Sequence, residues 1–408
     1  MRFAVMLYAF AGVSSRKVGK VMQLAGLFWN GLSGKSPSHV TVLQWVEKCG
    51  LALAKGSLRD MSAGEAYSLI YDNSITVCGQ ELHMELKAPA GHPGHSLGRA
   101  DVEVAAMKVG QGWDSRMVRE QIERTIDAGG RAPDYLLSDN GRVMRKAGRE
   151  LGIPHHRDIS HTFGIILEYV YSKEPDFASF VTKKGYARKF SHTPMAALMP
   201  PKRREYSRFM NAFDTVRWAK SVLDNGHVLT ADERRLLGFV AGHASLIDEL
   251  DCVMKAYEHM ERLCKQKGLS RETADECRRH IRASLMTQGD RVRRLADRLI
   301  DYFDTEERLL KPGETHNISS DIIESTFGML KERMSPNRNN GYTTIVLMLP
   351  TALKLSSIDE CRKFSVTKIL DNCTINDVRQ WREKNLLQNP SNRRRKLTKK
   401  AGTIMPLS

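Results

Sequence analysis

The pattern of apolar and polar residues changes several times along the chain, and it is clearest between residues 65 and 112. Residues 66–77 are rich in tyrosine, isoleucine and threonine, residues 81–87 alternate, and residues 102–109 form a third apolar run. Glycine and proline separate these runs, notably at residues 90–98. Short β-forming runs divided by turn residues are typical of strands. The pattern predicts a three-stranded antiparallel meander.

After Trp113 the pattern changes to a helical period, marked by Met117, Ile122 and Ile126, and Gly129 and Gly130 end it. Further changes of period predict a strand at residues 135–137, a helix at residues 143–151 and another strand at residues 154–159. The predicted order is therefore β-β-β-α-β-α-β.

Helical periodicity also dominates the beginning of the chain. The apolar residues 2–13 predict a helix in a buried core, and Ser14 and Ser15 precede a helical pattern at residues 16–30. After a turn rich in Gly, Ser and Pro, Ser38 is a candidate N-cap of a helix at residues 39–49, and Gly50 is a stop signal. Residues 1–56 are interpreted as a helix-turn-helix DNA-binding domain. A helical hairpin without a DNA role is the alternative.

The remainder of the chain is predicted to be mainly helical. Residues 162–315 contain long amphipathic runs at residues 231–263 and 271–302, and residues 316–335 form one more helix. The sequence predicts a helix-turn-helix domain at residues 1–56 and a core in two parts at residues 61–165 and 316–355. A helical insertion at residues 166–315 lies between these parts, and a helical, basic tail occupies residues 356–408.

Composition and charge point to the kind of partner. The chain of 408 residues has 63 Lys and Arg against 47 Asp and Glu, a formal net charge of +16. Such an excess favours a polyanionic partner, of which nucleic acid is the commonest. The seven cysteines are scattered and odd in number, which indicates reduced thiols and a cytoplasmic setting. The apolar stretch at residues 2–13 is too short to cross a bilayer, so no membrane association is expected.

Two aspartates stand where chemistry is expected. Asp72 interrupts a run of strand-forming residues, where an aspartate is disfavoured unless it has a role such as metal binding. Asp139 follows the predicted strand at residues 135–137, and functional groups gather at the carboxyl ends of strands in open α/β sheets. The alternatives are an exposed turn at Asp72 and a turn at Asp139-Asn140-Gly141.

Glu324 is the third candidate acid. It lies in a predicted helix after a segment rich in serine, and Lys331 follows it. Its spacing from Asp321 also fits a capping box, in which Asp321 caps the helix and Glu324 reaches back. Taken with Asp72 and Asp139, a metal-binding role is the preferred interpretation. Carboxylate oxygens are the ligands that Mg²⁺ prefers.

The order of elements and the three acids resemble the catalytic core of DDE transposases and retroviral-type integrases. The resemblance implies a ribonuclease-H-like α/β fold (β-β-β-α-β-α-β-α) with Asp72 and Asp139 side by side on its first and fourth strands. The long gap between Asp139 and Glu324 is similar to that of transposases with a helical insertion, such as the hAT and Mutator-like groups. The chain thus looks like a transposase of a bacterial insertion sequence.

That resemblance implies metal-dependent cleavage at transposon ends and strand transfer into target DNA. Two Mg²⁺ or Mn²⁺ ions are expected, because two metals can stabilise both the attacking and the leaving oxygen. Double-stranded DNA is the expected partner, the protein is expected to form a homo-oligomer on DNA at the nucleoid, and no small-molecule cofactor is expected. Two alternatives stay open: a ribonuclease-H-like nuclease or resolvase, and an inactive regulator derived from a transposase.

Further residues are assigned provisional roles in this scheme. His161 resembles a histidine that follows the fifth strand in such transposases, and Trp218 is a candidate for stacking on an unpaired base. For both, a purely structural role is the alternative. In a helix-turn-helix the first residues of the second helix face the bases. The predicted base contacts are His39, Thr41 and Gln44, and the predicted phosphate contacts are Arg16, Lys17 and Lys20. Further residues predicted to bind DNA are Lys331, Arg393, Arg394 and Arg395.

Overall fold

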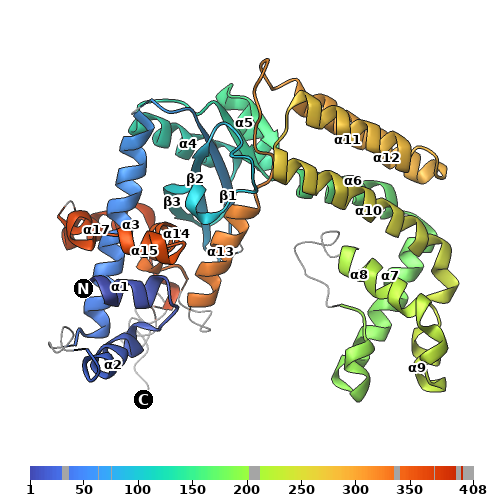
Figure 1. The fold of residues 1–408 in the computed structure, drawn as a ribbon, viewed down its shortest axis with the longest axis horizontal. Coiled ribbons are helices and arrows are strands. Elements are labelled where there is room, and N and C mark those ends of the chain that lie inside the picture. The colour runs from blue at the N-terminus through green and yellow to red at the C-terminus, as the bar shows by residue number, and fades with distance from the viewer. Residues whose placement is uncertain are drawn as a thin grey trace. The chain divides into compact units, whose positions relative to one another are not determined.

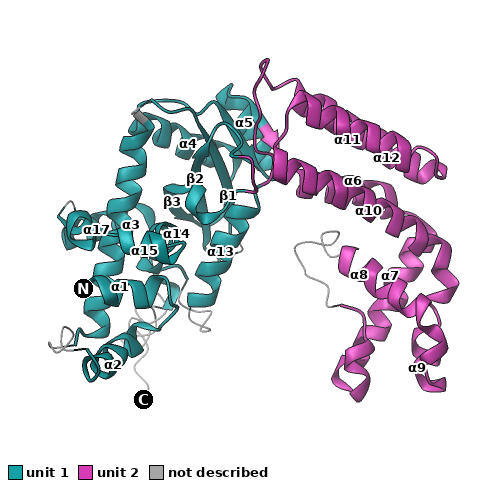
Figure 2. Cartoon of the chain, in the orientation of Figure 1, with its two compact units in different colours: residues 1–93, 97–155, 320–408 teal, residues 94–96, 156–319 magenta. Residues whose placement is uncertain are grey.

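The computed structural model describes residues 1–29, 36–62, 64–74, 76–201, 212–334, 341–371, 373–391 and 397. These residues form two compact units (Figure 2). Unit 1 comprises residues 1–93, 97–155 and 320–408, and unit 2 comprises residues 94–96 and 156–319. The helical insertion predicted at residues 166–315 thus corresponds to a unit that begins ten residues earlier in the chain and ends four residues later.

A five-stranded mixed sheet forms the centre of unit 1 (Figure 1). Its strands are β1 (Tyr67–Asn73), β2 (Glu81–Pro89), β3 (Glu103–Gly110), β4 (Tyr135–Ser138) and β5 (His155–Arg157), in the spatial order β3-β2-β1-β4-β5. β2 is antiparallel to both β1 and β3, whereas β4 is parallel to β1. The three predicted strands of the meander and the two later strands are confirmed.

Helices α4 (Ser115–Gly129) and α5 (Arg142–Leu151) cover one face of this sheet. Asp114 caps α4 by accepting a hydrogen bond from the Met117 amide, and Gly130 ends the helix in the left-handed conformation that glycine tolerates best. The apolar sides of both helices pack on Tyr67, Leu69 and Tyr71 of β1, which alternate with residues that face the other way.

The opposite face of the sheet packs against helices from both ends of the chain. These are α1 (Arg2–Ala9), α3 (His39–Ser62), α13 (Asp321–Arg333) and α14 (Met348–Lys354), whose apolar residues join those of the sheet in one cluster. The prediction of a helix in a buried core is confirmed for residues 2–9, because Ala4, Val5 and Tyr8 belong to this cluster, but the helix ends before residue 13.

The second helix of the predicted helix-turn-helix is much longer than expected. Ser38 caps it as predicted, since its hydroxyl accepts a hydrogen bond from the Thr41 amide at 3.1 Å. However, α3 continues through Gly50 to Ser62, so the predicted stop is wrong. A Cβ atom at Gly50 would lie 1.6 Å from the carbonyl oxygen of Leu347. Gly50 therefore allows another part of the backbone to approach the helix; it does not end the helix.

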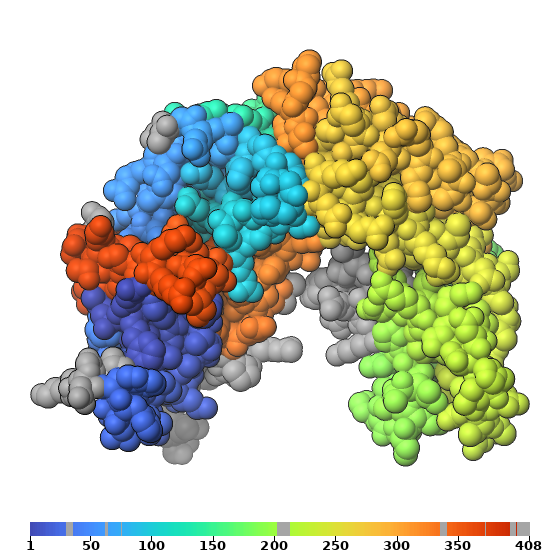
Figure 3. All heavy atoms as spheres, in the orientation of Figure 1, coloured from blue at the N-terminus to red at the C-terminus, as the bar shows by residue number. Residues whose placement is uncertain are grey.

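The C-terminal part of unit 1 is helical, as predicted. It contains α15 (Ile358–Lys363), α16 (Val366–Leu370) and α17 (Ile375–Asn385). The Arg2 side chain of α1 donates a hydrogen bond to the carbonyl of Cys361 at 2.6 Å, and Figure 3 shows the blue N-terminal surface beside the orange-red helices. α2 (Ser15–Gly26) lies near α1 and α3. Residues 1–56 thus share a core with the sheet and with the C-terminal helices.

Unit 2 is built from helices. They are α6 (Ile159–Tyr171), α7 (Pro175–Ala187), α8 (Ala212–Asp224), α9 (Ala231–Leu237), α10 (Ala244–Lys267), α11 (Arg271–Ser284) and α12 (Asp290–Glu307). Each of the two long amphipathic runs predicted here forms two helices, separated at residues 238–243 and 285–289. Apolar periodicity continued across both breaks and therefore did not reveal them.

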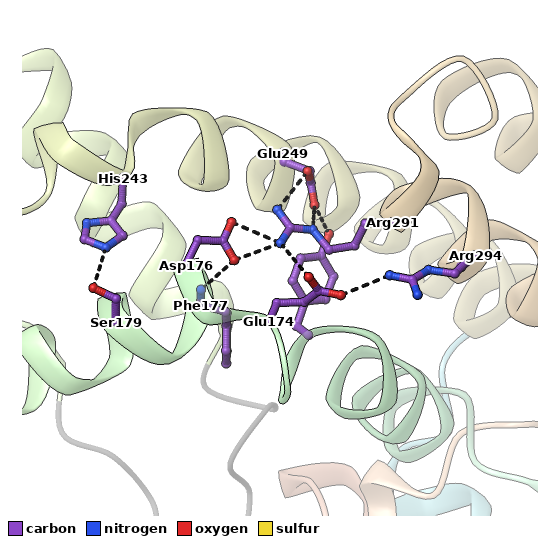
Figure 4. A network of polar contacts seen from close by, with 9 residues as sticks. Glu174, Asp176, Phe177, Ser179, His243, Glu249, Arg291 and Arg294 are labelled. Atoms are coloured by element: carbon purple, nitrogen blue, oxygen red, sulfur yellow. Dashed lines mark hydrogen bonds and ion pairs between the residues drawn. The ribbon is translucent and has the colours of Figure 1, made fainter.

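Ion pairs on a central arginine connect three helices of unit 2 (Figure 4). Arg291 of α12 donates from Nε to Glu249 Oε1 of α10 at 2.7 Å and from Nη1 to Asp176 Oδ1 of α7 at 2.9 Å. Its guanidinium also lies 5.0 Å from the ring centre of Tyr171, whose hydroxyl donates to Glu249. Burial opposes ionisation of Arg291, but the hydrogen bonds to Glu249 and Asp176 outweigh burial and raise its pKa.

A second polar chain in unit 2 is almost completely buried. Glu306 Oε2 lies 2.8 Å from His156 Nδ1, and Arg157 Nε donates to Glu306 Oε1 at 2.6 Å. His156 Nε2 continues the chain to His316 Nδ1 at 2.9 Å. Burial alone would raise the pKa of Glu306, but His156 and Arg157 outweigh burial and lower it. None of the described helices in either unit is long and apolar enough to cross a membrane.

Candidate active site

The parallel pairing of β1 and β4 brings the two predicted aspartates close to each other in the sheet. Ser68 pairs with Tyr135, and the register runs on to Ile70 opposite Leu137. Asp72 lies two residues beyond Ile70 in β1, and Asp139 lies two residues beyond Leu137, just after β4 ends at Ser138. Neighbouring strands lie about 4.8 Å apart, so these two positions are adjacent. The prediction that the two positions lie side by side is supported by this register.

Strand alternation places Asp72 on the same face of the sheet as Ile70. Ile70 and Leu137 belong to the apolar cluster that also contains Ile323 of α13. Because side chains alternate in a strand, Asp72 is on the face of Ile70, whereas Asp139 follows Ser138, the last residue of β4. Asp72 is therefore on the face against which α13 packs, and α13 is the helix that contains Glu324.

The surroundings of Asp72 and Asp139 can be compared with the turns that were the alternative interpretation of each residue. Asp72 lies within β1, is half-buried and pairs with Met84, so the exposed turn is wrong at this position. Asp139 does form the predicted turn, because its Oδ1 accepts a hydrogen bond from the Gly141 amide at 3.0 Å. This turn fixes the carboxylate of Asp139 at the carboxyl end of β4, where a ligand-binding group is expected.

Glu324 is less clearly part of the site. Helix α13 begins at Asp321 with Ser320 as its N-cap, so Asp321 is not the capping residue that the alternative required. Glu324 is exposed on this helix, next to the buried Ile323. Within the described residues, no three His, Cys, Asp or Glu side chains form a group that could hold a metal ion. The structure thus places Asp72 and Asp139 near the carboxyl ends of two neighbouring strands and Glu324 on a helix that packs on this sheet, with no three-acid metal centre among the described residues.

A hydrogen-bonded cluster supports the two strand ends from the opposite face of the sheet. The Tyr71 hydroxyl donates to the Met144 carbonyl at 3.0 Å and lies 3.3 Å from His155 Nε2. The Ser138 hydroxyl lies 2.8 Å from the same His155 nitrogen. Burial raises the pKa of Tyr71, and the charge of Asp139 adds to this effect. Tyr71 and Ser138, the residues before Asp72 and Asp139, are thus linked through His155.

A further buried polar group next to Asp72 was missed by sequence reasoning. His83 Nδ1 lies 2.8 Å from Asn73 Oδ1, and His83 Nε2 lies 3.1 Å from Glu85 Oε1. The side chains of His83 and Glu85 are fully buried, and the His83 ring lies 4.7 Å from that of Trp113. The only signal in the sequence was a pair of polar residues at alternate positions of an otherwise apolar strand. Such a pair is also typical of a strand with one exposed face.

Two accessory residues belong to unit 2. His161 Nδ1 lies 3.1 Å from Asp158 Oδ1, and this aspartate caps α6 through the His161 amide at 2.7 Å. Trp218 is half-buried, donates from its indole nitrogen to the Leu198 carbonyl at 2.9 Å and packs near Phe239. Trp218 thus has the structural role that was the alternative to base stacking.

The predicted DNA contacts of unit 1 are mostly on its surface. Arg16, Lys17 and Lys20 are exposed on α2, as are His39 and Gln44 on α3. Thr41 is half-buried, and its hydroxyl lies 2.9 Å from that of Ser38. Lys331 is exposed on α13. Arg393, Arg394 and Arg395, together with most of the predicted turn, lie outside the described residues.

A hollow of about 370 Å³ adjoins the beginning of α3. His39 and Gln44 line it together with Arg379 and Arg382 of α17. The residues predicted to read bases therefore lie beside two arginines that sequence reasoning did not single out. Compared with known protein families and with curated proteins, the chain matches none.

Proposed function

We propose that this chain is a DDE-type DNA transposase with a ribonuclease-H-like core in unit 1 and a helical insertion in unit 2. The strand order β3-β2-β1-β4-β5 supports this fold, as does the change from antiparallel to parallel pairing at β1. The observation on which the proposal rests is the placement of Asp72 and Asp139. Asp72 lies near the end of β1, Asp139 directly follows the parallel neighbour β4, and α13, the helix of Glu324, packs on the same sheet.

The chemistry of the two aspartates fits a divalent cation. Mg²⁺ is commonly held by one or two carboxylates together with water and substrate phosphate oxygens. A cation at this position would neutralise phosphate charge and activate a water molecule or hydroxyl as nucleophile. Asp72 and Asp139 would act as its ligands, and the turn at Gly141 would keep Asp139 in position.

Glu324 would complete the site from α13. Its exposed position suits a ligand that is drawn in when DNA and metal bind, because the neighbouring Ile323 already anchors the helix to the sheet. The basic residues of unit 1 would hold the DNA, and the hollow beside His39 and Gln44 would contact the transposon ends. Under this proposal the protein acts as a homo-oligomer on DNA and uses Mg²⁺ or Mn²⁺.

The decisive experiment compares DNA cleavage by the wild type, Asp139→Asn and a matched control. Asp127→Asn serves as the control because Asp127 is exposed on α4, away from the strand ends. The substrate is DNA that carries the inverted repeats flanking the coding region. With Mg²⁺ or Mn²⁺ we expect Asp139→Asn to lose cleavage and keep DNA binding, since the amide removes the charge that holds the cation. We expect the control to behave as the wild type.

The products separate the proposed activity from its alternatives. Joined donor and target DNA identify a transposase, whereas cleavage without joining identifies a nuclease or resolvase. Binding without cleavage by the wild type identifies a regulator. Cleavage by Asp139→Asn at the wild-type rate contradicts the assigned role of Asp139.

A further inference from the structure

A groove over the edge strand β3 gathers positive charge away from the candidate active site. It has a volume of about 340 Å³ and lies among α3, β3, α4 and α17. Its basic lining residues are Lys55, Lys108, Arg124 and Lys384. Amide side chains of Gln121, Gln380 and Asn385 also line it and could donate hydrogen bonds.

Only some of these cations are balanced by nearby carboxylates. Lys55 Nζ lies 3.0 Å from Asp377 Oδ1, and Arg124 lies 3.6 Å from Glu120. Lys108 and Lys384 form no ion pair with any residue of the described part of the chain. Lys108 is half-buried on β3, whereas Arg124 and Lys384 are exposed.

The cations of the groove repel one another. Burial lowers the pKa of Lys108, the positive charges of Arg124 and Lys384 lower it further, and the negative charge of Glu120 offsets only part of this. Holding like charges together costs stability, and clusters of this kind occur where a ligand supplies the opposite charge. The composition of the groove is therefore better suited to binding an anion than to stabilising the fold.

The strand registers place Lys108, a cation of the groove, on the other face of the sheet from Asp72. Asp72 pairs with Met84, and Met84 pairs with Met107, in one row. Asn73 pairs with His83, and His83 pairs with Lys108, in the next row. Because neighbouring rows point to opposite faces, Lys108 and Asp72 are on opposite sides of the sheet.

We propose that this groove binds phosphate groups of a nucleic-acid backbone, at a site separate from the acids. Helix α17 supports a polymer over a small anion, because its cations reach two hollows. Lys384 lines this groove, and Arg379 and Arg382 line the hollow beside Gln44. A backbone crossing α17 would contact both groups of cations. The excess of Lys and Arg over the whole chain favours the same partner.

The test measures binding of a short mixed-sequence duplex DNA to the full chain without divalent metal. The variants are Lys108→Gln, Lys384→Gln and the control Lys146→Gln, which removes an exposed lysine near Glu150 on α5. Each phosphate contact adds about 0.9 to the slope of log affinity against log salt. When the salt concentration rises from about 50 to about 200 mM, DNA affinity falls by some factor. We expect this factor to be about 3.5-fold smaller for each groove variant than for the wild type. The control should retain the wild-type slope.

A second readout separates a binding role from a structural one. Since Lys108 is repelled by its neighbours, Lys108→Gln should keep or raise the unfolding temperature while weakening DNA binding. Lower stability together with an unchanged salt slope overturns the proposal. A third measurement uses calorimetry to test whether inorganic pyrophosphate binds to the protein. If pyrophosphate binds the groove while DNA binding is the same in all variants, the groove is a small-anion site and the proposal is wrong. No cleavage is measured, so failure here is distinct from failure of the transposase assignment.

Discussion

The contact between Gly50 and Leu347 allows a direct test of how unit 1 is packed. In Gly50→Ala the added Cβ would lie 1.6 Å from the Leu347 carbonyl oxygen and 2.7 Å from its carbonyl carbon. Both atoms belong to the backbone, so no side-chain rotation relieves the overlap. Helix α3 and the 3₁₀ turn at Thr344–Leu347 would have to move apart, which disturbs the largest apolar cluster of unit 1.

The expected effect follows from two opposing terms. Overpacking of a close contact costs about 1–3 kcal/mol, and a contact with backbone belongs at the upper end of this range. Alanine is favoured over glycine inside a helix by about 1 kcal/mol. The net loss in the free energy of unfolding should therefore be about 2 kcal/mol.

Gly56→Ala is the matched control on the same helix. A Cβ at Gly56 meets no atom within 4 Å, so only the helix preference remains. This variant should be more stable than the wild type by up to about 1 kcal/mol. Hydrogen exchange of the α3 amides measures both effects locally, because a chain of two units need not unfold in one step. If the two variants change stability in the same direction and by the same amount, the close approach at Gly50 does not exist.

Two further predictions concern unit 2 and DNA recognition. Glu306→Gln should cost about 3 kcal/mol at neutral pH, because it breaks the buried contacts with His156 and Arg157. Because the pKa of Glu306 is lowered, its contribution to stability is present above the usual carboxyl pKa and is lost as the pH falls through the folded-state value. In urea unfolding, the stability of Glu306→Gln should therefore fall less with acid than that of the wild type. An equal fall in both proteins would contradict this. In the full chain, Gln44→Ala should weaken binding to the inverted repeat by about 1–3 kcal/mol and spare random DNA, whereas Lys20→Ala should weaken both alike. Gel shifts in which Gln44→Ala weakens both DNAs equally would make this helix structural.

The sequence by itself determined most of the elements and the positions of the two aspartates within them. Apolar alternation and glycine punctuation are local properties, and they predicted β1 to β5, α4 and α5 to within a few residues. The position of Asp72 in a run of strand formers and of Asp139 at a strand end was likewise a matter of local sequence. Local pattern is sufficient here because each residue's preference depends on its immediate neighbours and on the face that it presents.

Only the tertiary structure decided which distant residues meet. Gly50 has the signature of a helix stop, yet the approach of Leu347 explains it, and these residues are far apart in the chain. Lys108, Arg124 and Lys384 are unremarkable as single residues and become a cationic groove only when a strand and two helices meet. Contacts of this kind depend on packing between distant segments, and the helical and strand periods of a sequence carry no information about that packing.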